Sequence, residues 1–165
     1  SGTDLVVGAR GGAIQLLLYS VFRIGNASNN ISWRSYETIK GRPEVAWTIP
    51  LSLGDTHRGY RVLGTNLDYF KFYRYRRKQA LAFQAGKPFA DMFDAVLGAD
   101  VAVQLGYKVG DGLVVAHGLG SAGFSDHADK PFKVSGILTK TGTPIDRTVH
   151  ISQGFPGHRS AQPRQ

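Results

Sequence analysis

The chain has no cysteine among its 165 residues, which excludes a disulfide scaffold and a cysteine-ligated zinc or iron–sulfur site. Its longest apolar run, residues 13–22, contains Gln15 and is well short of the roughly 20 residues that cross a bilayer. The sequence shows no signal-peptide pattern. A chain of this length is expected to form one domain with a real core, or two small lobes that pack together.

The motifs of common enzymes are also missing. No Gly-x-Ser-x-Gly elbow occurs, and no spacing pairs a nucleophile with a base. Residues 5–12 are rich in glycine and precede an apolar run, but they match neither the dinucleotide pattern nor a phosphate-binding loop. The sequence therefore predicts that the chain is not an enzyme by itself and holds no cofactor.

Positive charge is in excess, with a formal net charge of +8. The densest basic segment, Tyr69–Lys78, interleaves basic and aromatic side chains. This composition is typical of surfaces on which the bases of single-stranded nucleic acid stack, and basic segments also bind anionic lipid headgroups. However, Tyr69, Phe72, Tyr73 and Arg76 are spaced as on one face of a helix. We therefore favour an amphipathic helix with its aromatic side chains in the core, and expect no nucleic-acid partner.

One polar loop combines imidazole and carboxylate groups, which are suitable ligands for zinc or another divalent ion. The loop contains no HExxH pair and would have to fold back to bring its ligands together. Solvated loop residues are thus the default interpretation, and His57 or His150 could join a site only through tertiary folding. The candidate metal ligands are His117, Asp126, His127 and Asp129.

The remaining pattern predicts an α+β fold, with short helices on a mostly antiparallel or mixed sheet. Ser32 can cap a helix over Trp33–Lys40, which Gly41 and Pro43 end, and residues 13–22 have the character of a helix or of a helix leading into a strand. The segments expected to be strands are Asp4–Gly8, Val45–Leu53, Gly59–Gly64 and Asp146–Ser152.

The most specific pattern covers residues 95–115 and 131–138. The apolar run Ala95–Leu97 ends at Gly98, and Gly106 stands where the end of a helix favours a left-handed residue. A Gly/Asp turn and a valine-rich run follow, and then Phe132 and Val134 alternate with polar neighbours. This pattern predicts a strand, a short helix, a turn and two further strands, without a reactive group.

These residues resemble the extracytoplasmic domain of FtsX-like ABC transporter permeases, a group that includes MacB-type exporters and lipoprotein-releasing permeases. In that family a segment vLG-x-x-x-A-x-x-L-g-x-x-x-GD precedes one strand, and a strand F-x-V-x-G-(I/V)-(L/F) follows. A generic strand–turn–helix unit is the alternative. The matching residues are Leu97, Gly98, Ala102, Leu105, Gly106, Gly110, Asp111 and 132–138, with support from 141–152.

The resemblance implies a porter-like α/β lobe near the membrane, formed by residues 1–65 plus 143–153. It also implies a β-rich lobe inserted at 66–142, and residues 154–165 are expected to be a disordered tail. The chain would be the periplasmic domain of a longer permease that is embedded in the bacterial inner membrane.

The resemblance further implies a role in coupling cytoplasmic ATP hydrolysis to export, extraction or mechanical signalling. The expected partners are a separate ABC ATPase subunit, a second permease in a homodimer or heterodimer, and a periplasmic protein. The alternative from a different class is a soluble periplasmic module that binds a metal or an anion through the histidine loop or the basic segment.

Overall fold

The computed structural model describes residues 5–9, 13–23, 31–116 and 131–153. A mixed seven-stranded sheet in the order β1-β2-β9-β6-β8-β5, with β7 beside β8, organises the domain and confirms the α+β prediction. The sheet strands are β1 (Ser52–His57), β2 (Tyr60–Thr65), β5 (Phe83–Gly86), β6 (Asp94–Leu97), β7 (Gly112–Leu113), β8 (Phe132–Leu138) and β9 (Thr148–Ser152). The helices are α1 (Ala13–Ser20), α2 (Trp33–Lys40), α3 (Leu67–Phe72), α4 (Ala99–Leu105) and the 3₁₀ helix η2 (Pro144–Arg147).

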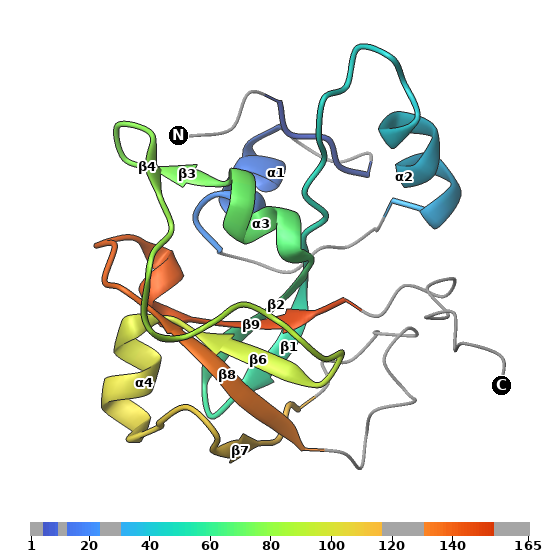
Figure 1. Ribbon diagram of the computed structural model, residues 1–165. Coiled ribbons are helices and arrows are strands. Elements are labelled where there is room, and N and C mark those ends of the chain that lie inside the picture. The colour runs from blue at the N-terminus through green and yellow to red at the C-terminus, as the bar shows by residue number, and fades with distance from the viewer. Residues whose placement is uncertain (1–4, 10–12, 24–30, 117–130, 154–165) are drawn as a thin grey trace, which may run out of the picture.

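Helices cover both faces of the sheet: α3 lies on one side, and α4 lies on the other (Figure 1). Successive residues of a strand point to opposite faces, so each central strand supplies two cores. In β2, Val62 belongs to the core with α4, whereas Leu63 belongs to the core with α3. The central strands β2, β6 and β9 are therefore buried along almost their whole length, as expected for strands covered on both faces.

Strand β9 brings the early and late parts of the chain together. It runs parallel to β2, pairing Arg61 with Thr148, and antiparallel to β6, pairing Val96 with His150. The expected porter-like lobe is residues 1–65 plus 143–153, and the expected inserted lobe is residues 66–142. Strands from both ranges thus belong to one sheet. The division into two lobes at those boundaries remains a prediction.

Several expected elements are confirmed. Helix α2 has the predicted bounds, and the Ser32 hydroxyl accepts a hydrogen bond from the Ser35 amide at 3.1 Å. Helix α4 ends at Gly106, whose φ of 71° is the left-handed conformation expected there. The predicted strands at 95–97, 132–136 and near 146–152 are present as β6, β8 and β9.

Other expected elements are wrong in position or type. Residues 5–8 form no strand. Strand β1 starts only at Ser52 and runs to His57, so it overlaps the strand expected over Val45–Leu53 at its last two residues alone. The helix expected through Arg76 ends at Phe72. After it the chain forms a separate hairpin of β3 (Arg74–Tyr75) and β4 (Gln79–Ala80).

Helix α3 is short because the chain after it turns back on itself in this hairpin, with Arg77 and Lys78 at positive φ. Tyr69 and Phe70 point into the core beneath the helix, while the basic residues that follow stay in solvent at the hairpin turn. None of the helices in the described ranges has the length and hydrophobicity required to span a bilayer.

Candidate functional site

The predicted metal ligands His117, Asp126, His127 and Asp129 lie outside the described residues. Within 5–9, 13–23, 31–116 and 131–153, no group of three or more histidines and carboxylates is placed to hold a metal ion. The metal-site hypothesis at the 117–129 loop therefore stays a prediction.

His57, one of the two histidines considered as additional ligands, is held by the protein at both ring nitrogens. Its Nδ1 lies 2.6 Å from the Val114 carbonyl oxygen, and its Nε2 lies 2.8 Å from the Tyr107 hydroxyl. A carbonyl oxygen can only accept, so Nδ1 donates and, in the neutral ring, Nε2 accepts from Tyr107. This buried arrangement ties β1 to the segment after α4.

His150, the other histidine, is fully buried in β9 on the face covered by α3. Its Nδ1 donates to the Val96 carbonyl oxygen at 3.0 Å, and its ring contacts Tyr69 and Phe70. Burial is the main cause that lowers its pKa to about 3; the hydrogen bond to Val96 opposes this shift, and the nearby Arg23 charge adds to it. His57 and His150 thus have separate partners and form core contacts.

The neutral His150 predicts a pH-dependent stability. Its pKa is about 3 in the folded chain and 6.5 as the ordinary value, so the unfolded chain takes up a proton first as the pH falls. The group has no effect above pH 6.5, and below it the free energy of unfolding falls by up to about 1.4 kcal/mol per pH unit until the folded pKa is reached.

Urea unfolding of the parent chain and of His150→Phe between about pH 7 and pH 5 measures this effect. The parent should lose roughly 2 kcal/mol more than the variant over this range, because only the parent carries the buried imidazole. Equal pH slopes for the two proteins would contradict the assignment. The other histidines are common to both and cancel in the comparison.

A tight turn at residues 140–148 forms the best-defined polar structure of the described chain. The buried Asp146 carboxylate accepts from the Thr141 amide at 2.7 Å, from the Thr141 hydroxyl at 2.9 Å and from the Gly142 amide at 2.7 Å. The Thr143 hydroxyl caps η2 by accepting from the Ile145 amide. The turn consequently holds Arg147 at a fixed place at the start of β9.

The strand–helix junction of the sequence motif packs directly against this turn. At Gly98, a β-carbon would lie 2.5 Å from the Asp146 carbonyl oxygen and nearer still to that of Ile145. Only glycine allows the two backbones to approach so closely. The pattern at residues 95–106 and the Thr141–Ser152 segment, which are distant in sequence, are thus parts of one packed unit.

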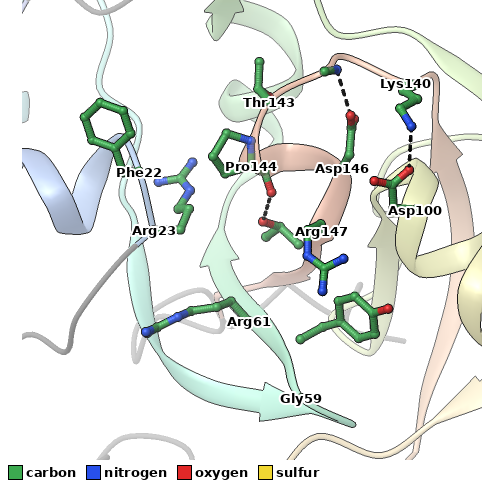
Figure 2. Close-up of a pocket in the computed structure, with 13 residues that line it drawn as sticks. Phe22, Arg23, Gly59, Arg61, Asp100, Lys140, Thr143, Pro144, Asp146 and Arg147 are labelled. Carbon is green, nitrogen blue, oxygen red and sulfur yellow. Dashed lines mark hydrogen bonds and ion pairs between the residues drawn. The ribbon is translucent and has the colours of Figure 1, made fainter.

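A pocket of about 470 Å³ opens beside this turn, between η2, the β2 hairpin end and the segment after α1 (Figure 2). Four basic side chains and two carboxylates line it. Both carboxylates are already occupied, Asp146 by the turn and Asp100 by Lys140 at 3.1 Å. The basic lining residues are Arg23, Arg61, Lys140 and Arg147.

Arg23 is the unusual member of this lining, because its side chain is only 6% exposed. Its φ of 60° is left-handed, a conformation that non-glycine residues seldom adopt. The guanidinium donates to the Ser20 carbonyl oxygen at the end of α1, and among the described residues it forms no ion pair. A buried cation without a carboxylate partner is costly, so its position calls for compensating negative charge.

Arg147 and Arg61 complete the basic wall. The Arg147 guanidinium lies 5.0 Å from the centre of the Tyr60 ring, in a cation–π contact, and is exposed to solvent. Figure 2 shows the Asp146 side chain directed toward the turn, on the opposite side of η2 from the three arginines. The open side of the pocket is therefore positive.

Sequence reasoning did not find this pocket. Its residues come from four separated parts of the chain, near 22, 60, 100 and 140–148, and no local spacing joins them. The sequence indicates an excess of positive charge, +8, but its densest basic segment is residues 69–78, which do not line the pocket.

The mixed sheet with a core on each face defines an α+β domain. The α+β architecture is consistent with a porter-like domain. The family model of the MacB-like periplasmic core domain matches residues 3–165, so the chain belongs to this family. No curated protein matches the sequence.

Family membership makes the chain the periplasmic domain of an ABC transporter permease, which works together with an ATPase. Such domains are transporter components and are generally not catalytic themselves. The parent permease belongs to the inner membrane, as the family implies. The alternative of a free-standing metal- or anion-binding module is not supported.

Proposed function

We propose that this domain transmits the motion of the permease to the periplasm, to drive export, extraction or signalling. ATP binding and hydrolysis on a separate cytoplasmic subunit move the transmembrane helices, and the domain shifts against a second permease or a periplasmic protein. The observation that carries the proposal is the family match over residues 3–165. Two features of the fold support it.

The first feature is a firm link between α1 and the sheet. The Tyr19 hydroxyl donates to the Leu53 carbonyl oxygen at 2.7 Å and accepts from the Leu53 amide at 2.8 Å. Burial raises the pKa of Tyr19, although its hydrogen bond to Leu53 opposes this, so the phenol stays protonated and can donate. A displacement of α1 is thereby passed to β1 and across the sheet.

The second feature is an apolar surface around α1. Leu5, Ile14 and Leu17 are 79%, 73% and 49% exposed, and Val7 is nearly half exposed. Exposed apolar side chains gathered in one region mark an interaction surface more often than a solvated one. We assign this surface to the second permease of a dimer.

Cysteine cross-linking in the full-length permease tests the proposal. A Leu17→Cys substitution on the α1 surface should give a covalent dimer with a short bis-maleimide, and cross-linking should stop transport while ATP hydrolysis continues. Val103→Cys is the matched control, because Val103 is 77% exposed but lies on α4.

The control variant should give little covalent dimer and keep its transport. Equal cross-linking at both positions would refute the dimer surface. Unimpaired transport by the cross-linked Leu17→Cys protein would refute the transmission of motion through this region.

A further inference from the structure

We propose that the pocket beside the 140–148 turn binds an oxyanion of the phosphate class between Arg23 and Arg147. This site is separate from the transmission of motion and does not depend on it. It also uses neither the 117–129 loop nor the basic segment 69–78.

The first argument is the charge of the pocket. Its two carboxylates are committed to other groups, since Asp146 is saturated by the Thr141 and Gly142 donors and Asp100 pairs with Lys140. Arg61 already interacts within the protein. Arg23 and Arg147 have no ion pair among the described residues, so the positive charge of the pocket is not neutralised by the protein groups described there.

The second argument is the position of Arg23. Burying a guanidinium without a counter-charge costs several kcal/mol, in general, unless an anion or good hydrogen bonds compensate. The Ser20 carbonyl oxygen accepts from one of its nitrogens, and the Tyr69 hydroxyl is also within its reach, which still leaves further donors of the five that a guanidinium carries. The guanidinium is planar and presents pairs of N–H donors, which can bind two oxygens of a phosphate group at once.

The third argument is the apolar side of the pocket. The Phe22 side chain is 48% exposed, and Pro144 lies opposite it across the pocket (Figure 2). A free oxyanion needs no such surface, whereas an oxyanion attached to an apolar group would cover it. The volume of about 470 Å³ is larger than a phosphate group alone fills.

Calorimetric titration of the chain with two probes tests the site. The probes are inorganic phosphate and a dihexanoyl phosphatidic acid kept below its micelle-forming concentration. We expect saturable binding of one or both. Preference for the phosphatidic acid identifies a lipid headgroup as the source of the oxyanion, whereas equal affinity identifies a free oxyanion.

The decisive variant is Arg147→Gln, which removes an exposed pocket charge and should leave the fold intact. We expect its dissociation constant to rise about tenfold, the effect of one charge-assisted hydrogen bond. Arg42→Gln is the matched control: it removes the same charge from an exposed residue outside the pocket and should change the constant little.

A second readout separates binding from damage to the fold. Saturating ligand should raise the unfolding temperature of the parent chain and of Arg42→Gln, and raise that of Arg147→Gln less. The absence of saturable binding by both probes would overturn the proposal. Equal weakening by Arg147→Gln and Arg42→Gln would also overturn it, because it would indicate diffuse attraction to a basic surface.

Discussion

Replacing Gly98 by alanine should lower the free energy of unfolding by about 3 kcal/mol, since overpacking a rigid contact costs on this order. The new methyl group would lie within 2.5 Å of the Asp146 carbonyl oxygen and closer to that of Ile145. Both atoms belong to the backbone of η2, so they cannot rotate away. The junction between β6 and α4 would have to separate from the 140–148 turn.

Urea unfolding followed by far-ultraviolet circular dichroism measures the loss. Gly112→Ala is the matched control, because its β-carbon would meet no atom nearer than 3.9 Å. It should change stability by less than about 0.5 kcal/mol.

Gly98 also precedes α4 as its N-cap, without a side-chain hydrogen bond to the helix. Serine is a good N-cap, so a Gly98→Ser substitution separates the two effects. If the close backbone approach dominates, serine is destabilising like alanine. Stability at or above that of the parent would show that the contact does not matter.

These glycines explain why the sequence was most informative at residues 95–138. Gly98 and Gly106 are demanded by a close approach and by a left-handed helix end, and such backbone requirements leave a pattern that can be read locally. The helix at 33–40 was predictable for the same reason, because Ser32 caps it within four residues. The signals of Ser32 and Gly106 arise within a few residues of each helix end, whereas Gly98 is required by its contact with the distant 140–148 turn.

The errors have the opposite origin. The aromatic spacing of residues 69–76 was compatible with a helix, but the helix ends at Phe72 because Arg74 and Tyr75 pair with the β4 strand of the following hairpin. Strand β1 is fixed by its pairing with β2, Leu53 with Leu63 and His57 with Tyr60, rather than by the apolar run before it. Tertiary packing overrides local propensity in both places.

The charged pocket shows the same limit for function. Arg23 and Arg147 are 124 positions apart (147 minus 23) and line one pocket, which η2, the start of β2 and the segment after α1 form together. Nothing in the neighbouring residues distinguishes these two arginines from the other basic residues of a basic chain. Only the folded arrangement shows that the carboxylates near them are already occupied.

Asp146 is the residue through which stability and the pocket are connected. Its carboxylate is 2% exposed and accepts three hydrogen bonds from Thr141 and Gly142. In Asp146→Ala the Thr141 and Gly142 amides lose their acceptor in a buried turn. Because unsatisfied buried donors cost roughly 1–3 kcal/mol each, we expect the free energy of unfolding to fall by about 3 kcal/mol.

Asp100→Ala is the control on the same pocket, since its ion pair with Lys140 joins side chains that are 28% and 68% exposed. Exposed ion pairs contribute less than about 1 kcal/mol, so this variant should remain close to the parent in urea unfolding. Equal losses of unfolding free energy in the two variants would show that the hydrogen bonds to Asp146 stabilise the chain no more than an exposed ion pair does. A large difference between the two variants would show that the buried carboxylate holds the turn that carries Arg147. In that case Asp146→Ala should weaken oxyanion binding, although it removes a negative charge from the pocket.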